Sequence, residues 1–235
     1  MSTWNPRATV GSRVRAGAAA LLLLAASVSA ADAGPAPAWP DDFSSRLEAL
    51  AVLQTLNVEL LSHDSATLTL ERWCEAHKLA APAHVVAELV RGADKSPTTE
   101  LLQLLGVSAA DAVRYRRVRL HCGEHVLSEA DNWYVPARLT PEMNHVLETT
   151  DTAFGRAVAA LHFQRRTLSA RLLWAPLPEG WEMGVAAPAS HAGTLSIPPR
   201  LIEHRAVLSL PGGTPFSVVV ETYSNEVLAF PRPSR

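Results

Sequence analysis

The sequence predicts a single α+β domain with a mainly antiparallel sheet of about six strands. Apolar residues recur at three- and four-residue steps between Phe43 and Leu60, which is the pattern of an amphipathic helix. Most of the remaining chain consists of short β-branched or alternating runs separated by turn residues, such as Gly123-Glu124 and Pro211-Gly212-Gly213. Helices followed by hairpins favour an antiparallel sheet over alternating parallel units.

The elements can be assigned in chain order. Asp41 or Asp42 caps the first helix, and a second helix follows over 66–77, before Pro82. The stretch 176–199 is rich in Pro, Gly, Ala and Ser, so we expect a long loop inserted in the same domain. Short helices are expected over 98–105, 141–149 and 153–161, and strands over 84–91, 112–122, 126–135, 167–174, 201–210 and 216–223.

The first 30 residues have the pattern of a cleaved export signal. Three arginines precede a short apolar run, and small residues end it at Ala30, with Ala33 as a second cleavage point. The alternative is an uncleaved membrane anchor, but the run is short for a span. We therefore expect a signal peptide over 1–30, a Pro/Ala-rich linker over 31–42, the domain over 43–229 and a tail over 230–235, with the mature chain periplasmic or secreted.

Charge and cysteine content restrict the partners. Loss of the three arginines changes the formal net charge from −2 to about −5, and no basic cluster remains, so we expect no nucleic-acid partner. We also expect a monomer, without a stable membrane anchor after cleavage of the signal. Cys74 and Cys122 form one disulfide in an oxidising compartment or remain two buried thiols. No CxxC or His-rich spacing is present, so we expect neither a metal nor a cofactor.

Glu221 is the first candidate site residue, because it closes the apolar run 216–223. A carboxylate in a buried strand needs a hydrogen-bonding partner, a changed pKa or a ligand. The plain alternative is an edge strand on which Glu221 reaches water.

Two further segments offer binding groups. Arg117, Arg119 and His121 share one strand face, which is either a solvated sheet face or an anion-binding wall opposite Glu221. A third interpretation is an internal salt bridge between Arg117 and Glu221 without any ligand. Thr152 can cap a helix whose first N–H groups would bind a carboxylate, and Gly155 would allow close approach of a ligand.

Several motifs, taken in order, resemble those of the chorismate pyruvate-lyases over most of the expected mature chain. These motifs are LLSHDSAT (60–67), YRRVRLHC (115–122), YVP (134–136), TDTAFGR (150–156), RTLS (166–169) and VVETY (219–223). The resemblance implies an antiparallel sheet whose helical flaps cover an internal pocket, and an enzyme that eliminates pyruvate from chorismate to give 4-hydroxybenzoate without a cofactor. It implies that Arg117 and Glu221 are catalytic, with Glu221 as the acid. It also implies that the backbone N–H groups of Ala66 and Phe154, beside Gly155, bind the substrate carboxylate.

The chain also departs from this family. Ala66 and Phe154 replace other apolar residues, and Ala153 stands where the family usually has proline. The 176–199 insertion has no counterpart in the compact enzymes, and chorismate is a cytoplasmic metabolite. The match of Cys122 to a cysteine of cytoplasmic relatives favours free thiols. The alternative function is therefore a non-catalytic, exported binding protein for a small aromatic carboxylate.

Overall fold

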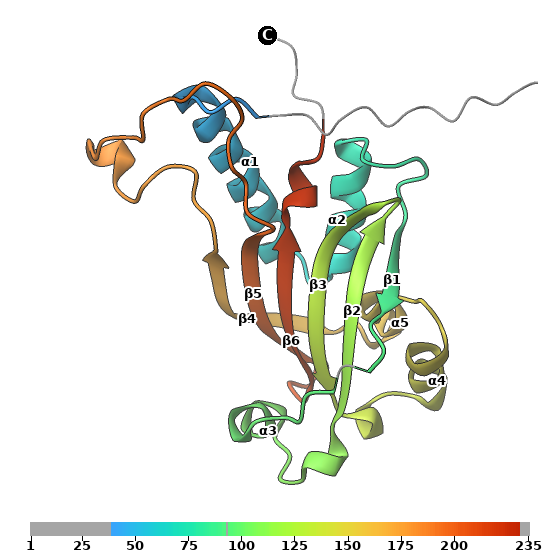
Figure 1. The fold of residues 1–235 in the computed structure, drawn as a ribbon. Coiled ribbons are helices and arrows are strands. Elements are labelled where there is room, and N and C mark those ends of the chain that lie inside the picture. Colours follow the sequence, from blue (N-terminus) through green and yellow to red (C-terminus); the bar gives the residue numbers. More distant parts are fainter. Residues whose placement is uncertain (1–38, 93, 231–235) are drawn as a thin grey trace, which may run out of the picture. The chain divides into compact units, whose positions relative to one another are not determined.

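Six antiparallel strands form one sheet in the order β1-β2-β3-β6-β5-β4 (Figure 1). The computed structural model describes residues 39–92 and 94–230. The strands are β1 (Val85–Leu89), β2 (Arg114–Cys122), β3 (His125–Tyr134), β4 (Gln164–Leu172), β5 (Arg200–Ser209) and β6 (Pro215–Ser224). The α+β fold class and the antiparallel sheet expected from the sequence are confirmed.

The helices begin where the sequence supplies capping side chains. The carboxylate of Asp42 accepts a hydrogen bond from the Ser45 amide at 2.7 Å, and the Ser65 hydroxyl accepts one from the Leu68 amide at 3.4 Å. The helices are α1 (Phe43–Leu61), α2 (Ala66–Ala76), α3 (Thr99–Leu105), α4 (Pro141–Thr149) and α5 (Phe154–Ala157). Short 3-10 turns span Ala110–Ala112, Pro136–Arg138, Ala159–Leu161, Trp181–Met183 and Asn225–Leu228.

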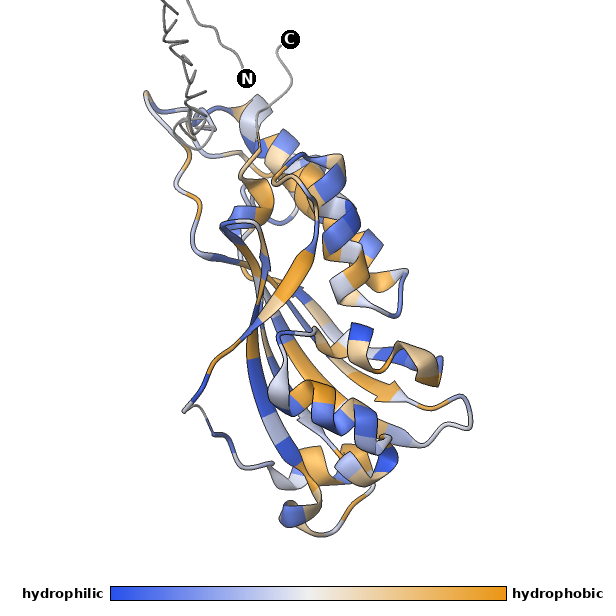
Figure 2. Cartoon of the chain, turned by 90° about the vertical axis from the view of Figure 1, so that its right-hand side faces the viewer, coloured by the Kyte–Doolittle hydropathy of each residue, from blue (hydrophilic) through white to orange (hydrophobic). Residues whose placement is uncertain are grey.

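The helices cover the two faces of the sheet unequally. The α1 and α2 helices pack on one face over a core that includes Leu53, Leu120 and Tyr223, and α4 and α5 extend this layer. The α3 helix packs on the opposite face, where Leu105 contacts a cluster with Trp133. Figure 2 shows the arrangement from the side, with hydrophobic segments in orange along strands and helices. One face of the sheet is therefore deeply covered by helices.

Glu221 lies in the interior of this sheet. The strand that carries it, β6, is flanked by β3 and β5, and Glu221 is paired with Ala130 on one side and His204 on the other. The alternative in which Glu221 reaches water from an edge strand is therefore wrong.

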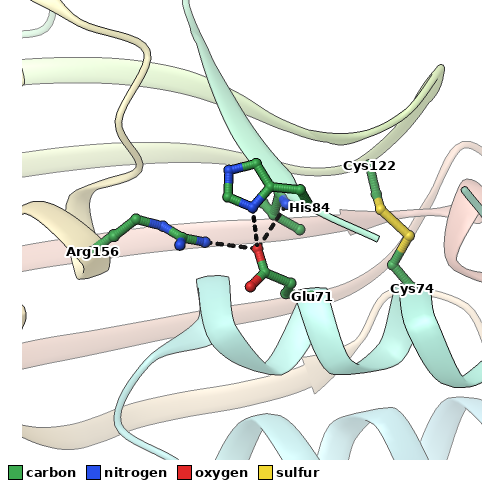
Figure 3. Close-up of a disulfide and its surroundings, with 6 residues drawn as sticks. Glu71, Cys74, His84, Cys122 and Arg156 are labelled. Carbon is green, nitrogen blue, oxygen red and sulfur yellow. Dashed lines mark hydrogen bonds and ion pairs between the residues drawn. A yellow bond between two sulfur atoms is a disulfide. The ribbon is translucent and has the colours of Figure 1, made fainter. Parts of the chain in front are cut away.

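A disulfide joins the helical layer to the sheet. Cys74 of α2 is bonded to Cys122 at the end of β2, across a sequence separation of 48 residues (Figure 3). Both cysteines are fully buried. Of the two alternatives that the sequence left open, the structure contains the disulfide.

The expected elements differ from the structure mainly around α5. The sequence predicts one helix over 153–161, but the structure has the four-residue α5 and a separate 3-10 turn. The break occurs because Val158, with φ −102° and ψ 8°, is no longer α-helical. The 176–199 stretch is a long connection between β4 and β5, with one 3-10 turn. The expected signal peptide, most of the linker and nearly all of the tail lie outside the described residues.

Candidate functional site

A small cavity lies between the sheet and the segments that begin α2 and α5. Its volume is about 40 Å³, enough for a few water molecules. The walls are mostly apolar, and polar side chains enter from four strands, β2, β3, β4 and β6. The apolar walls include Val118, Leu120, Ala130, Phe163, Leu208 and Val219.

Arg116 on β2 is the principal cation of the cavity. Only 5% of its surface is exposed, and one terminal nitrogen donates to the carbonyl oxygen of Thr152 at 3.0 Å. Its Nε has no hydrogen-bond partner, and no carboxylate of the described residues lies within ion-pairing distance of the guanidinium. Burial lowers the pKa of Arg116, and the nearby Tyr134 and Asp151 offset only part of this effect. A buried guanidinium without a counterion favours binding of an anion.

Glu221 on β6 is held by two donors at the same carboxylate oxygen. Its Oε2 accepts from Nη2 of Arg165 at 2.5 Å and from the hydroxyl of Tyr223 at 3.1 Å. Burial alone would lower the pKa of Arg165, but Glu221 more than offsets this, so the pKa is raised. Burial, and then Glu221, raise the pKa of Tyr223 well above its ordinary value. The other oxygen, Oε1, makes no hydrogen bond within the described residues, so it can accept one from a ligand.

A buried histidine lies beside this ion pair. His204 on β5 is fully buried, and its Nε2 lies 2.8 Å from Oδ1 of Asn57 on α1. Its Nδ1 has no partner in the part of the chain that the structure describes. Burial lowers the pKa of His204, since the charged ring is poorly solvated. We therefore treat His204 as a neutral ring that supports the Glu221 strand.

Four of the five residues expected at the site line this cavity: Ala66, Phe154, Gly155 and Glu221. The backbone at Gly155 lies close to the start of α2, because a Cβ at this position would lie 2.8 Å from the hydroxyl oxygen of Ser65. Ala66 begins α2, and the first N–H groups of a helix have no acceptor within it. Their roles toward a ligand stay predictions.

The expectation that Arg117 faces Glu221 is wrong. Successive side chains of a strand point to opposite faces, and the cavity is on the face of Val118 and Leu120. Arg117 lies on the other face, where Nη2 donates to Glu129 at 2.9 Å. The cavity arginine is its neighbour Arg116. The interpretation of an internal salt bridge to Glu221 was right about the bond but named the wrong arginine.

Sequence reasoning missed Arg116 and Arg165. A signal for Arg116 was present, because it alternates in register with Val118 and Leu120, which form the apolar face of β2. No comparable signal exists for Arg165. Its position depends on β4 lying beside β5 and near β6, which only the assembled sheet defines.

Two features are absent from the described residues, a membrane-spanning helix and a metal-binding cluster. None of the helices in the described part of the chain combines the length and apolar character needed to cross a bilayer. Residues 39–92 and 94–230 also hold no group of three or more His, Cys, Asp or Glu suited to a metal ion.

The fold and cavity define an α+β domain with an internal cavity lined by two buried arginines, Arg116 and Arg165. The chain belongs to the family of the uncharacterized protein y4mC of Sinorhizobium fredii (strain NBRC 101917 / NGR234). The two are 58% identical over 207 residues, which cover 88% of this chain and 87% of y4mC. No protein-family model matches the sequence.

Solved structures with some likeness come from transcriptional regulators. One is the possible transcriptional regulator YydK of Bacillus subtilis subsp. subtilis str. 168, with a TM-score of 0.37 and 16% identity over 64% of this chain and 62% of YydK. Another is a GntR-family transcriptional regulator of Enterococcus faecalis V583, with a TM-score of 0.38 and 12% identity over 63% of this chain and 99% of the other. At these TM-scores, the likeness gives this chain neither a ligand nor a partner.

Two expectations from the sequence are corrected by these comparisons. Assignment to the chorismate pyruvate-lyases, as a divergent exported member, is contradicted, because the comparisons give the uncharacterized protein y4mC and transcriptional regulators, one of them of the GntR family. The expectation of no nucleic-acid partner is withdrawn, because the similar solved structures are of transcriptional regulators, although their low TM-scores assign no such partner to this chain.

Proposed function

We propose that the cavity binds a small carboxylate with an apolar, ring-sized body, and that Arg116 is the cation that holds it. The buried, unpaired Nε of Arg116 carries this proposal. A guanidinium binds a carboxylate through parallel N–H donors, and such charge-assisted bonds are strong where water is excluded. The apolar walls suit the body of the ligand.

Glu221 adds a second requirement for the ligand. Glu221 lines the cavity and its Oε1 has no hydrogen bond within the described residues, so the far end of the ligand should carry a donor such as a hydroxyl group. An aromatic hydroxy acid such as 4-hydroxybenzoate has both groups. It therefore serves as the probe for the site.

Binding is better supported than elimination of pyruvate from chorismate. Elimination would need a proton from Glu221, but this carboxylate forms a 2.5 Å ion pair with Arg165. An ionised carboxylate accepts hydrogen bonds and has no proton to donate. We therefore expect the purified chain to bind 4-hydroxybenzoate and to form none of it from chorismate.

Calorimetric titration of the purified chain tests the site. Arg116→Gln should weaken binding of 4-hydroxybenzoate by about tenfold to a hundredfold, since a hydrogen bond to a charged group contributes roughly 1.5–3 kcal/mol. Arg117→Gln is the matched control, because it removes a cation from the next position on the opposite face. Equal affinity of wild type and Arg116→Gln would refute the assignment. A wild type that binds no 4-hydroxybenzoate would refute the ligand class.

We also propose that the chain acts in an oxidising compartment. The Cys74–Cys122 disulfide supports this, because structural disulfides form and persist mainly outside the reducing cytosol. N-terminal sequencing of the protein recovered from fractionated cells would test export. A start at Met1 in the cytoplasmic fraction would contradict it.

A further inference from the structure

We propose that α5 is a lid over the cavity and that Glu71 of α2 is the latch that holds the lid closed. This inference rests on the proposed function, because a lid matters only if the cavity admits a ligand. The inference extends the proposed function by describing how a ligand gains access to the site.

Glu71 of α2 is bonded through one oxygen atom to two other segments, α5 and the start of β1 (Figure 3). Its Oε2 accepts from Arg156 of α5 at 2.7 Å, from the Val85 amide at 2.9 Å, and lies 3.1 Å from Nδ1 of His84. Burial alone would raise the pKa of Glu71, but these partners more than offset it, and the pKa lies below its ordinary value. The only contact that ties Glu71 to α5 is the one with Arg156.

The lid is short and has few bonds of its own. The α5 helix has four residues, two of which, Phe154 and Gly155, line the cavity. The amides of Arg156 and Ala157 both donate to the carbonyl of Ala153, and no side chain caps the helix. A helix this short is not stable by itself, so contacts with its neighbours keep it in place.

The closed position is incompatible with a ring-sized ligand. The cavity of about 40 Å³ is far smaller than the roughly 150 Å³ in which a benzene molecule has room. At the lid, Gly155 lies directly against Ser65, the residue that caps α2. For a ring to reach Arg116, α5 and the start of α2 must separate.

The other walls of the cavity are more firmly fixed than α5. β2, β3 and β6 are paired along their length within the sheet, and the disulfide fixes α2 to β2 beyond Glu71. This leaves α5 as a wall held by side-chain contacts, such as those of Phe154 with Tyr134 and Phe216, and not by a strand ladder or a disulfide. Release of the Glu71–Arg156 pair is the step that frees it.

Hydrogen exchange without any ligand tests the latch. In Glu71→Gln, the amides of residues 156–158 should exchange about three to ten times faster than in wild type, since a partly exposed ion pair contributes modestly. Sheet amides of β3 and β6 should keep their wild-type rates. Glu75→Gln, an exposed change one turn along the same helix, is the matched control. If Glu71→Gln does not fold, Arg156→Gln breaks the same pair from the lid. Unchanged exchange at 156–158 in the folded variant would overturn the latch.

A reversible covalent lock tests the lid. The Cβ of a residue at 155 would lie 3.7 Å from the Cβ of Ser65, which suits a disulfide. The association rate of 4-hydroxybenzoate should be at least about tenfold lower for the oxidised Ser65→Cys/Gly155→Cys variant than for its mildly reduced form. Each single variant and wild type, treated identically, serve as controls. Equal rates in the oxidised and reduced forms would overturn the lid. If wild type binds no 4-hydroxybenzoate, the proposed function fails, while the exchange experiment still decides on the latch.

Discussion

Removal of the disulfide by Cys74→Ala/Cys122→Ala should destabilise the domain by a predictable amount. The cross-link closes a loop with a sequence separation of 48 residues. For a loop of this length, the chain-entropy relation gives about 4 kcal/mol of stabilisation at 25 °C, through restriction of the unfolded chain. Alanine is chosen because both positions are fully buried and serine would leave an unsatisfied hydroxyl there.

Urea unfolding followed by tryptophan fluorescence gives the measurement. A domain of this size has roughly 5–15 kcal/mol of stability, so the variant should fold but unfold at clearly lower urea. In a thermal scan, about 4 kcal/mol corresponds to a fall in Tm of about 8–16 °C. The free energy of unfolding of wild type measured in dithiothreitol should match that of the variant. Dithiothreitol should leave the free energy of unfolding of the variant unchanged. A difference between oxidised wild type and variant below about 1 kcal/mol would refute the loop-entropy reasoning. Two alkylatable thiols in the native protein would show that no bond exists.

Three other outcomes follow from the same contacts. Arg165→Met and Glu221→Gln should each lower the free energy of unfolding by about 3–5 kcal/mol, because each leaves a buried group without its partner. The double variant should lose clearly less than the sum of the two single losses. Additive losses in urea unfolding would argue against coupling between the two residues. Burial lowers the pKa of His204, so the unfolded chain binds more protons and stability should fall as the pH drops below about 6.5. His204→Gln should reduce that fall between pH 7.5 and 5.5, and an identical pH profile would contradict the assignment. Leu53→Ala, at a fully buried position on α1, should lower the free energy of unfolding by about 2–5 kcal/mol. A loss under about 1 kcal/mol would mean that the helix packs loosely on the sheet.

Local patterns were sufficient for most of the fold. The helices of 43–60 and 66–77 and the strands around Gly123 were predicted within a few residues, because apolar spacing, caps and turn residues are encoded close together in sequence. The break after α5 was missed, because no proline or glycine signals that Val158 leaves the helix. This short segment depends on packing against α2.

The candidate site was predicted less completely than the fold. Glu221 was found because a carboxylate in an apolar strand is unusual, but its partner Arg165 follows from the strand order β6-β5-β4. Arg117 was chosen over Arg116 because of the polar row on its face and because of the resemblance to the chorismate pyruvate-lyases. The apolar alternation of Val118 and Leu120 was the better guide, because an internal site lies on the buried face.

The strand order also has a consequence for the time at which the cavity forms. The last strand, β6, lies in the middle of the sheet between β3 and β5. Its pairing with β3 joins Ala130 to Glu221, which are distant in sequence, so the chain must close a long loop before the sheet is complete. During synthesis, β3 would present an open edge until residues 215–224 leave the ribosome. The two halves of the sheet, and with them Arg116 and Glu221, meet only at the end of folding.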